Sequence, residues 1–122
     1  MKKCISKQNN RQIGSYYETR AKHYLIEKGY EVIQMNFRCR LGEIDMIAKD
    51  GEYTVFIEIK YRSNQKCGLP RESVTYYKRQ TILGVAKYYL MKTRLSDTPC
   101  RFDVIEILKE DIHHIQNAFM EG

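Results

Sequence analysis

Two strongly β-prone stretches joined by a tight turn constrain the fold of this chain more than any other feature. Residues 43–49 and 53–61 are rich in apolar residues, and Asp50-Gly51 between them is a strong two-residue hairpin signal. The second stretch contains TVFIEIKY, the most β-prone sequence in the chain. The pattern therefore predicts two antiparallel neighbouring strands.

Helices and further strands are expected on both sides of this hairpin. Apolar residues at steps of three and four predict helices over residues 13–28 and 73–92, and Gly29 occupies the usual place of a left-handed helix cap. Strands are expected over residues 30–37 and 101–108. The predicted order is α-β-β-β-α-β, which describes an α/β domain with helices packed against one mixed sheet.

Length and composition favour a single small domain. The chain has 122 residues, of which 43% are apolar. We expect a flexible segment over residues 1–12, the α/β domain over residues 13–108, and a tail or short extra strand over residues 109–122. No stretch approaches the ~20 apolar residues of a membrane span. The first twelve residues lack the apolar centre of a signal peptide.

Cysteine usage and charge indicate the compartment and the partner. The cysteines contain no CxxC pair, so reduced thiols in the cytoplasm are expected for Cys4, Cys39, Cys67 and Cys100. Lys and Arg total 21 against 15 Asp and Glu, which gives a formal charge of +6. A basic surface attracts polyanions such as nucleic acid, although many basic domains of this size bind none.

Charged residues interrupt the two apolar strands of the hairpin. Side chains alternate along a strand, so Glu58 and Lys60 share one face, about 6–7 Å apart. Asp45 interrupts the neighbouring strand. Counted from a turn at Asp50-Gly51, the register of Asp45 and Glu58 is slightly offset, and a bulge or diagonal pairing is expected to bring the two carboxylates together.

Two converging carboxylates and a lysine have a specific chemical use. The carboxylates make an oxygen site that Mg²⁺ or Mn²⁺ accepts, and the lysine can orient or deprotonate an attacking water. The plainer interpretation is that Glu58 and Lys60 form a solvated pair on an exposed strand face. The combination of Asp45, a tight hairpin and ExK in the most apolar strand is rarer than ExK alone.

Together these motifs resemble a known family. Gly14 and Glu18, with residues 42–45, 56–62 and 101–104, are similar to the bacterial YraN-type family, which is regarded as related to archaeal Holliday-junction resolvases. The resemblance covers residues 13–108. It implies a restriction-endonuclease-like domain of the PD-(D/E)xK superfamily.

The resemblance also implies roles for individual residues. The PD-(D/E)xK residues fall on Asp45, Glu58 and Lys60, with Ile44 in place of the proline. The resolvase relatives use a glutamate of the first helix, which matches Glu18, and the carbonyl of Ile59 is expected as a further metal ligand. Glu18 has a plainer interpretation as a flanking charge that pairs with Lys22.

Basic residues surround the expected site. These basic residues either contact the phosphates of a nucleic acid or form a solvated rim without a ligand, and the sequence leaves both interpretations open. They are Arg38, Arg40, Arg62, Arg71, Lys78 and Arg79. Glu43 is expected either beside the metal ligands or hydrogen-bonded to the Arg38–Arg40 turn. Tyr61 and Tyr76 could stack on bases, whereas Tyr77 fits the helix stripe and is expected in the core.

Asp103 is interpreted as the partner of Arg101 rather than as a metal ligand. His113 and His114 are interpreted as tail residues, since no cysteine or third histidine nearby completes a zinc site.

Three functions follow from these features. The first is a Mg²⁺- or Mn²⁺-dependent endonuclease acting on DNA, with branched or structured DNA among its candidate substrates. A junction has two symmetric cuts, which favours a homodimer. The second is a nucleic-acid-binding module with the same fold and no turnover, and the third is a protein-interaction domain with an exposed apolar patch.

Overall fold

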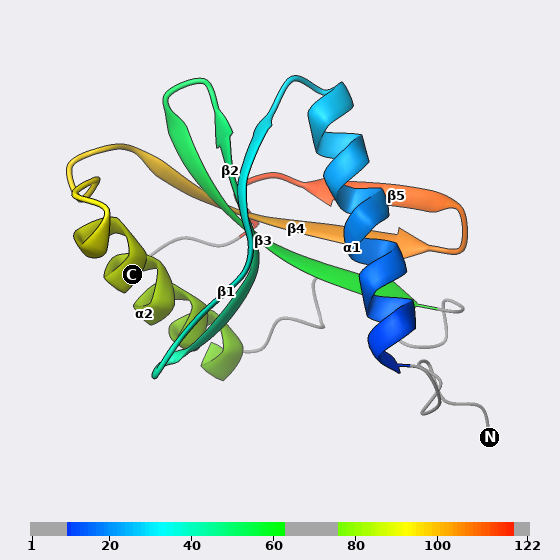
Figure 1. Cartoon of the computed structure of the whole chain (residues 1–122), viewed down its shortest axis with the longest axis horizontal. Coiled ribbons are helices and arrows are strands. Elements are labelled where there is room, and N and C mark those ends of the chain that lie inside the picture. Colours follow the sequence, from blue (N-terminus) through cyan, green and yellow to red (C-terminus); the bar gives the residue numbers. More distant parts are fainter. Residues whose placement is uncertain (1–9, 63–75, 119–122) are drawn as a thin grey trace.

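Two helices pack on a single five-stranded sheet in the computed structural model, which describes residues 10–62 and 76–118 (Figure 1). The elements in chain order are α1 (Asn10–Glu27), β1 (Glu31–Cys39), β2 (Gly42–Asp50), β3 (Tyr53–Arg62), α2 (Tyr76–Lys92), β4 (Cys100–Leu108) and β5 (Asp111–Ile115). The predicted α-β-β-β-α-β order and mixed sheet are confirmed. The last strand continues the sheet beyond Leu108, so the strand alternative for the C-terminal stretch is correct.

The sheet has the order β1-β2-β3-β4-β5, and only β3 and β4 are parallel. Tight turns make antiparallel neighbours of β1, β2 and β3. A parallel neighbour requires a longer crossover, and α2 lies within that connection. The edge strands are β1 and β5.

Each helix covers one face of the sheet. On the α2 side, Phe56 packs with Ile82 and Tyr89 in one buried cluster. On the α1 side, Val55 and Ile57 pack with Leu25 in a second cluster. Consecutive residues of β3 thus enter different clusters, as strand alternation requires. Figure 1 shows the sheet between the two helices.

Two glycines set local geometry. Gly29 follows α1 with φ 96°, and the N–H groups of Gly29 and Tyr30 donate to the carbonyls of Ile26 and Leu25. This is the predicted left-handed cap, in the two-bond form of the Schellman motif. Gly42 begins β2 with φ 153°, and a Cβ added there would lie 2.5 Å from Cγ2 of Thr81. The turn between β1 and β2 therefore approaches α2 too closely for a side chain.

The expectation that Tyr77 is buried is wrong, because its side chain is 81% exposed. Nine residues, about two and a half turns, separate Tyr77 from Ala86, which puts the two on opposite sides of α2. The buried stripe of α2 is Ile82, Leu83, Val85, Ala86, Tyr89 and Leu90. Residues 73–75, with which this helix was expected to begin, lie outside the described residues.

The expected offset between β2 and β3 is also wrong. The turn residues are Gly51 and Glu52, one position later than predicted, and the pairs run regularly from Asp50–Tyr53 to Met46–Ile57. This register continues without a bulge as far as Met46–Ile57, the pair that precedes Asp45 and Glu58.

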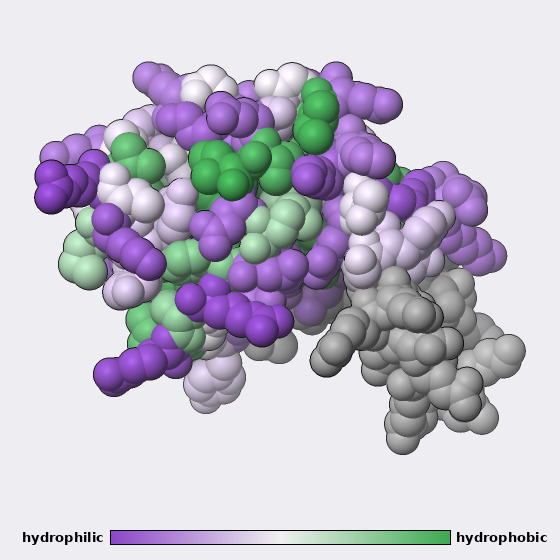
Figure 2. All heavy atoms as spheres, in the orientation of Figure 1, coloured by the Kyte–Doolittle hydropathy of each residue, from purple (hydrophilic) through white to green (hydrophobic). Residues whose placement is uncertain are grey.

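Figure 2 shows a mostly hydrophilic face with apolar side chains gathered over β1 and the C-terminal end of α1, elements in which Ile26 and Ile33 are exposed. Cys39 and Cys100 carry reduced thiols. Neither described helix has the length and apolarity to cross a membrane.

Candidate active site

The regular ladder between β2 and β3 ends just before Asp45. Met46–Ile57 is its last pair, and beyond it the backbone N–H of Ile59 donates to Asp45 Oδ2 at 2.8 Å. The N–H and C=O of one strand residue point to the same side, so the carbonyl of Ile59 also faces the β2 side. Asp45 and the backbone of Ile59 thus meet where the two strands stop pairing.

Glu58 lies beside them, 5% exposed, and contacts two lysines. Its Oε2 is 3.4 Å from Nζ of Lys60 and 3.0 Å from Nζ of Lys78. Lys60 comes from the same strand and Lys78 from the first turns of α2. Buried charge is costly without a partner, and these ammonium groups supply it.

The sequence predicts Lys78 among the basic residues around the site, whereas the structure puts it in contact with Glu58 at the centre of the site. The spacing of Lys78 from the apolar residues of α2 already indicated this position. Ile82 and Val85 follow Lys78 at steps of four and seven, so all three share the buried side of α2. A lysine on the apolar side of α2 points towards the sheet, where its ammonium contacts the carboxylate of Glu58.

Burial and the charge of Glu58 change the pKa values of Asp45 and Lys78. Burial, followed by the negative charge of Glu58, raises the pKa of Asp45 to about 7, although the Ile59 N–H and Lys78 act in the opposite direction. Burial lowers the pKa of Lys78, but the charge and hydrogen bond of Glu58 outweigh it and leave that pKa raised. The site thus holds more acid than its lysines fully compensate.

The donor set fits a divalent cation in part. Asp45 and Glu58 offer carboxylate oxygens, and the carbonyl of Ile59 faces the same side, which suits a hard cation such as Mg²⁺. No third Asp, Glu, His or Cys joins them among the residues that the structure describes. The remaining ligands of a bound ion would be water and substrate oxygens.

Glu18 is held elsewhere. It lies on α1, where Nδ2 of Asn36 donates to its Oε1 at 3.3 Å, and its charge contributes to raising the pKa of Tyr61, after burial and Tyr17. The structure therefore unites Asp45, Glu58 and Lys60 and leaves Glu18 outside their group.

The other acidic residue near the site has a clear partner. Glu43 Oε2 is 3.2 Å from Nε of Arg38, as one of the two interpretations expected. The charge of Glu43 also contributes to raising the pKa of Asp45.

The basic residues divide into three groups. Lys78 belongs to the site itself. Arg38 and Arg40 lie at the end of the β1–β2 hairpin, and Arg79 lies on α2 next to Lys78. The side chain of Arg62 and all of Arg71 lie outside the described residues, so their phosphate contacts stay a prediction.

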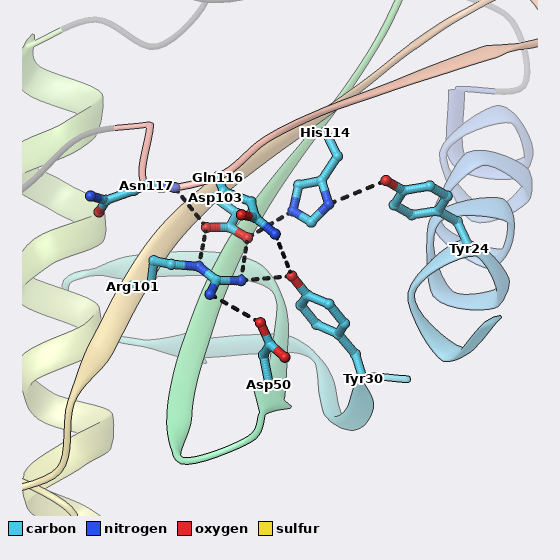
Figure 3. Close-up of polar contacts among 8 residues, drawn as sticks. All are labelled: Tyr24, Tyr30, Asp50, Arg101, Asp103, His114, Gln116 and Asn117. Atoms are coloured by element: carbon cyan, nitrogen blue, oxygen red, sulfur yellow. Dashed lines mark hydrogen bonds and ion pairs between the residues drawn. The ribbon is translucent and has the colours of Figure 1, made fainter. Parts of the chain in front are cut away.

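A second polar cluster lies on the α1 side of the sheet (Figure 3). The carboxylate of Asp103 is fully buried; it accepts from Nε and Nη2 of Arg101 at 3.0 and 3.1 Å and from the Asn117 N–H at 3.0 Å. His114 Nε2 is 2.7 Å from the same carboxylate. A carboxylate accepts only, so this ring nitrogen carries the proton. The predicted Arg101–Asp103 pair is confirmed.

Arg101 extends this cluster to the last residue of β2 and to the residue that precedes β1. Its Nη1 is 3.0 Å from Asp50 Oδ2, and its Nη2 donates to the hydroxyl of Tyr30 at 2.7 Å. Burial raises the pKa of Asp103, but the hydrogen bonds from His114, Arg101 and Asn117 outweigh it and lower the pKa below its usual value. The cluster ties β5 and the start of β1 to the middle of the sheet.

The interpretation of His114 as a tail residue is wrong. Its side chain is 5% exposed, because β5 pairs with β4 and sets His114 beside Ile105. Alternation puts His113 and His114 on opposite faces. An acid at position 103 within an apolar strand was the signal that a partner for it lay elsewhere in the chain.

Comparisons with known proteins identify the family of this chain. The model of the uncharacterised protein family UPF0102 matches residues 17–107. The chain belongs to this family, which confirms the YraN-type resemblance.

Several relatives share nearly the whole chain. A UPF0102 protein of Lachnoclostridium phytofermentans is 50% identical over 112 residues, covering 91% of this chain and 95% of that protein. One of Clostridioides difficile is 49% identical over 113 residues, with 91% and 99% covered. One of Geotalea uraniireducens is 43% identical over 116 residues, with 91% of each chain covered.

Proposed function

We propose that this protein is a divalent-metal-dependent nuclease that hydrolyses phosphodiester bonds in DNA, with a restriction-endonuclease-like fold. The observation that carries the proposal is the meeting of Asp45, Glu58 and the Ile59 backbone at the point where β2 and β3 stop pairing. One buried and one half-buried acid whose repulsion is incompletely offset are what a cation site looks like before the cation binds. The α-β-β-β-α-β order agrees with the superfamily that the resemblance implies.

Asp45, Glu58 and the carbonyl of Ile59 would hold Mg²⁺ or Mn²⁺. When bound, such an ion lowers the pKa of a coordinated water and offsets the charge of the phosphate in the transition state. Asp45 is kept in place by the Ile59 N–H, which fixes the direction of its second oxygen. This preorganisation reduces the reorganisation needed when substrate arrives.

Lys60 would act on the attacking water. Its side chain is 27% exposed and its Nζ lies 3.4 Å from Glu58 Oε2, so the residue is close to the acids while still open to solvent. From there it can hold a water in line with the phosphate and offset charge on the phosphate oxygens. Lys78 would neutralise Glu58 until metal and substrate replace that contact.

Cleavage of labelled single-stranded, duplex, flapped and four-way-junction DNA with Mg²⁺ or Mn²⁺ tests the proposal. Glu58→Gln and Lys60→Met should each lower the rate by at least about 100-fold, since each removes a charge used in the transition state. Glu31→Gln and Lys49→Met are matched controls on β1 and β2 and should cleave at the parent rate. Equal loss in the controls, or activity in Glu58→Gln, would refute the assignment.

One observation favours a second function, a nucleic-acid-binding module without turnover. Glu58 already contacts Lys60 and Lys78 at 3.4 and 3.0 Å, so its charge has protein partners without a metal. In that case the protein binds DNA equally well with and without divalent cations. No cleavage product would form, and Glu58→Gln would leave the affinity unchanged.

A further inference from the structure

A hollow of about 390 Å³ lies where the β1–β2 turn meets the C-terminal half of α2. This volume is within the range of small-ligand sites. The hollow is lined by Arg38, Cys39, Arg40, Leu41, Tyr88 and Lys92. In Figure 2 the corner that holds the β1–β2 turn carries strongly hydrophilic side chains around apolar ones.

The lining combines positive charge with an aromatic face. Three of the described lining residues are cationic and none is acidic. Tyr88 is 37% exposed and leans against Phe37 at a centroid distance of 6.3 Å, which supports its ring from behind. Leu41, 59% exposed, adds an apolar wall. A base can stack on an aromatic ring while its phosphate contacts cations, and this pairing is typical of single-strand recognition.

The hollow is joined to the candidate active site by β2. Arg38 lines the hollow and also pairs with Glu43, which is two residues from Asp45. Cys39 is opposite Gly42, and the three residues from Gly42 to Asp45 span about 10 Å of strand. A short nucleic-acid strand can therefore reach both places at once.

We propose that this hollow binds one unpaired nucleotide of single-stranded DNA, with the base stacked on Tyr88 and the phosphate held by Arg40 and Lys92. The inference rests on the nucleic-acid partner of the proposed function, and it is independent of hydrolysis. It selects DNA with unpaired bases beside the site of cleavage over continuous duplex, in which every base is stacked on its neighbours.

Anisotropy of a fluorescent oligothymidine and of a matched duplex, measured in EDTA, tests the proposal. The oligothymidine should bind more tightly than the duplex. Tyr88→Ala should weaken its binding about 5- to 100-fold, and Tyr88→Phe, which keeps the ring, should bind like the parent. Arg40→Ala and Lys92→Ala should each lower the salt slope by about one, whereas Lys22→Ala on α1 should leave it unchanged.

Cys39 offers a second readout that needs no variant. Alkylation of its thiol, followed by peptide mass spectrometry, should slow when the oligothymidine is bound, while alkylation of Cys100 should not. Parent-like binding by Tyr88→Ala, or unchanged alkylation of Cys39 with the strand bound, would overturn the inference.

The two proposals can fail separately. If the protein binds single-stranded DNA through Tyr88 but cleaves no DNA, the proposed nucleotide site is supported and the proposed nuclease activity is refuted. Cleavage that depends on Glu58 in a protein whose Tyr88→Ala variant binds and cleaves normally would do the reverse.

Discussion

Asp45 accepts a hydrogen bond of 2.8 Å from the backbone N–H of Ile59, across the point where β2 and β3 cease to pair. A carboxylate there replaces a carbonyl that a continued ladder would have supplied. The arrangement holds an acid in a largely buried place where its charge is unfavourable.

The unfavourable charge of Asp45 should make the free energy of unfolding depend on pH. The pKa of Asp45 is about 7 in the folded protein and near 4 in the unfolded chain, so the folded state binds the extra proton between these values. Without divalent cations, the free energy of unfolding should therefore fall as pH rises from about 4 to about 7. Asp45→Asn should remove this fall and be more stable than the parent at pH 8, by about 1–3 kcal/mol. Urea denaturation across this pH range measures it, and parallel curves for the two proteins would contradict the assignment.

A divalent cation bound at Asp45 should offset this unfavourable charge and stabilise the folded protein. At about 10 mM Mg²⁺ and a dissociation constant near 1 mM, the parent should gain about 1.4 kcal/mol of stability. Asp45→Asn has lost a ligand charge and should gain much less. Thermal unfolding with Mg²⁺, Mn²⁺ and no cation makes the comparison; equal shifts in both proteins would argue against a metal at Asp45.

Lys78 should compete with that cation. Its ammonium is 3.0 Å from Glu58 Oε2, so Lys78→Gln should cost about 1 kcal/mol of stability without metal, a value limited by its partial exposure and by Lys60. The same variant should bind Mg²⁺ more tightly, because no ammonium has to be displaced. Calorimetric titration measures the affinity, with Lys22→Gln on α1 as the control. Weaker Mg²⁺ binding in Lys78→Gln would show that Lys78 helps to form the metal site instead.

The buried pair of Arg101 and Asp103, on the α1 side of the sheet, should govern acid unfolding. The pKa of Asp103 is lowered in the folded protein, so its contribution is complete above about pH 4 and is lost as pH falls through the folded value. Asp103→Asn should cost about 3 kcal/mol at pH 7, since it leaves Arg101 buried with fewer partners. The difference between variant and parent should shrink below pH 4. Chemical denaturation at pH 7 and pH 3 tests this; a constant difference would contradict it.

The close approach at Gly42 gives a prediction that involves no charge. A Cβ there would be 2.5 Å from Thr81 Cγ2, and the backbone φ of 153° disfavours any other residue. Gly42→Ala should therefore destabilise the fold by about 1–3 kcal/mol. Gly51→Ala is the control for backbone strain alone, since nothing lies within 4 Å of its added Cβ. An equal loss in both variants would mean that contact with α2 contributes nothing.

The elements were predictable because their signals are local. Hydrophobic period, the hairpin turn and the cap at Gly29 each depend on a few consecutive residues, and all four expected strands and both helices are present. Strand alternation likewise placed Glu58 and Lys60 on one face.

What sequence reasoning missed depends on contacts between distant elements. The meeting of Lys78 with Glu58 needs the docking of α2, although the phase of the helix pointed to it. The burial of His114 needs the pairing of β5 with β4. Tyr77 was misplaced by a different cause, an error of half a turn in helical phase, which was avoidable from the sequence.

The contact between Lys78 and Glu58 also bears on how the chain folds. The β1-β2-β3 meander closes through short turns, so Asp45, Glu58 and Lys60 can come together early, whereas the second counter-charge, Lys78, arrives only when α2 docks across the sheet. Until then the two acids repel each other in a partly collapsed chain. Refolding without divalent cations should accordingly be faster at mildly acidic pH than at pH 8, with the docking of α2 as the step that the acids delay.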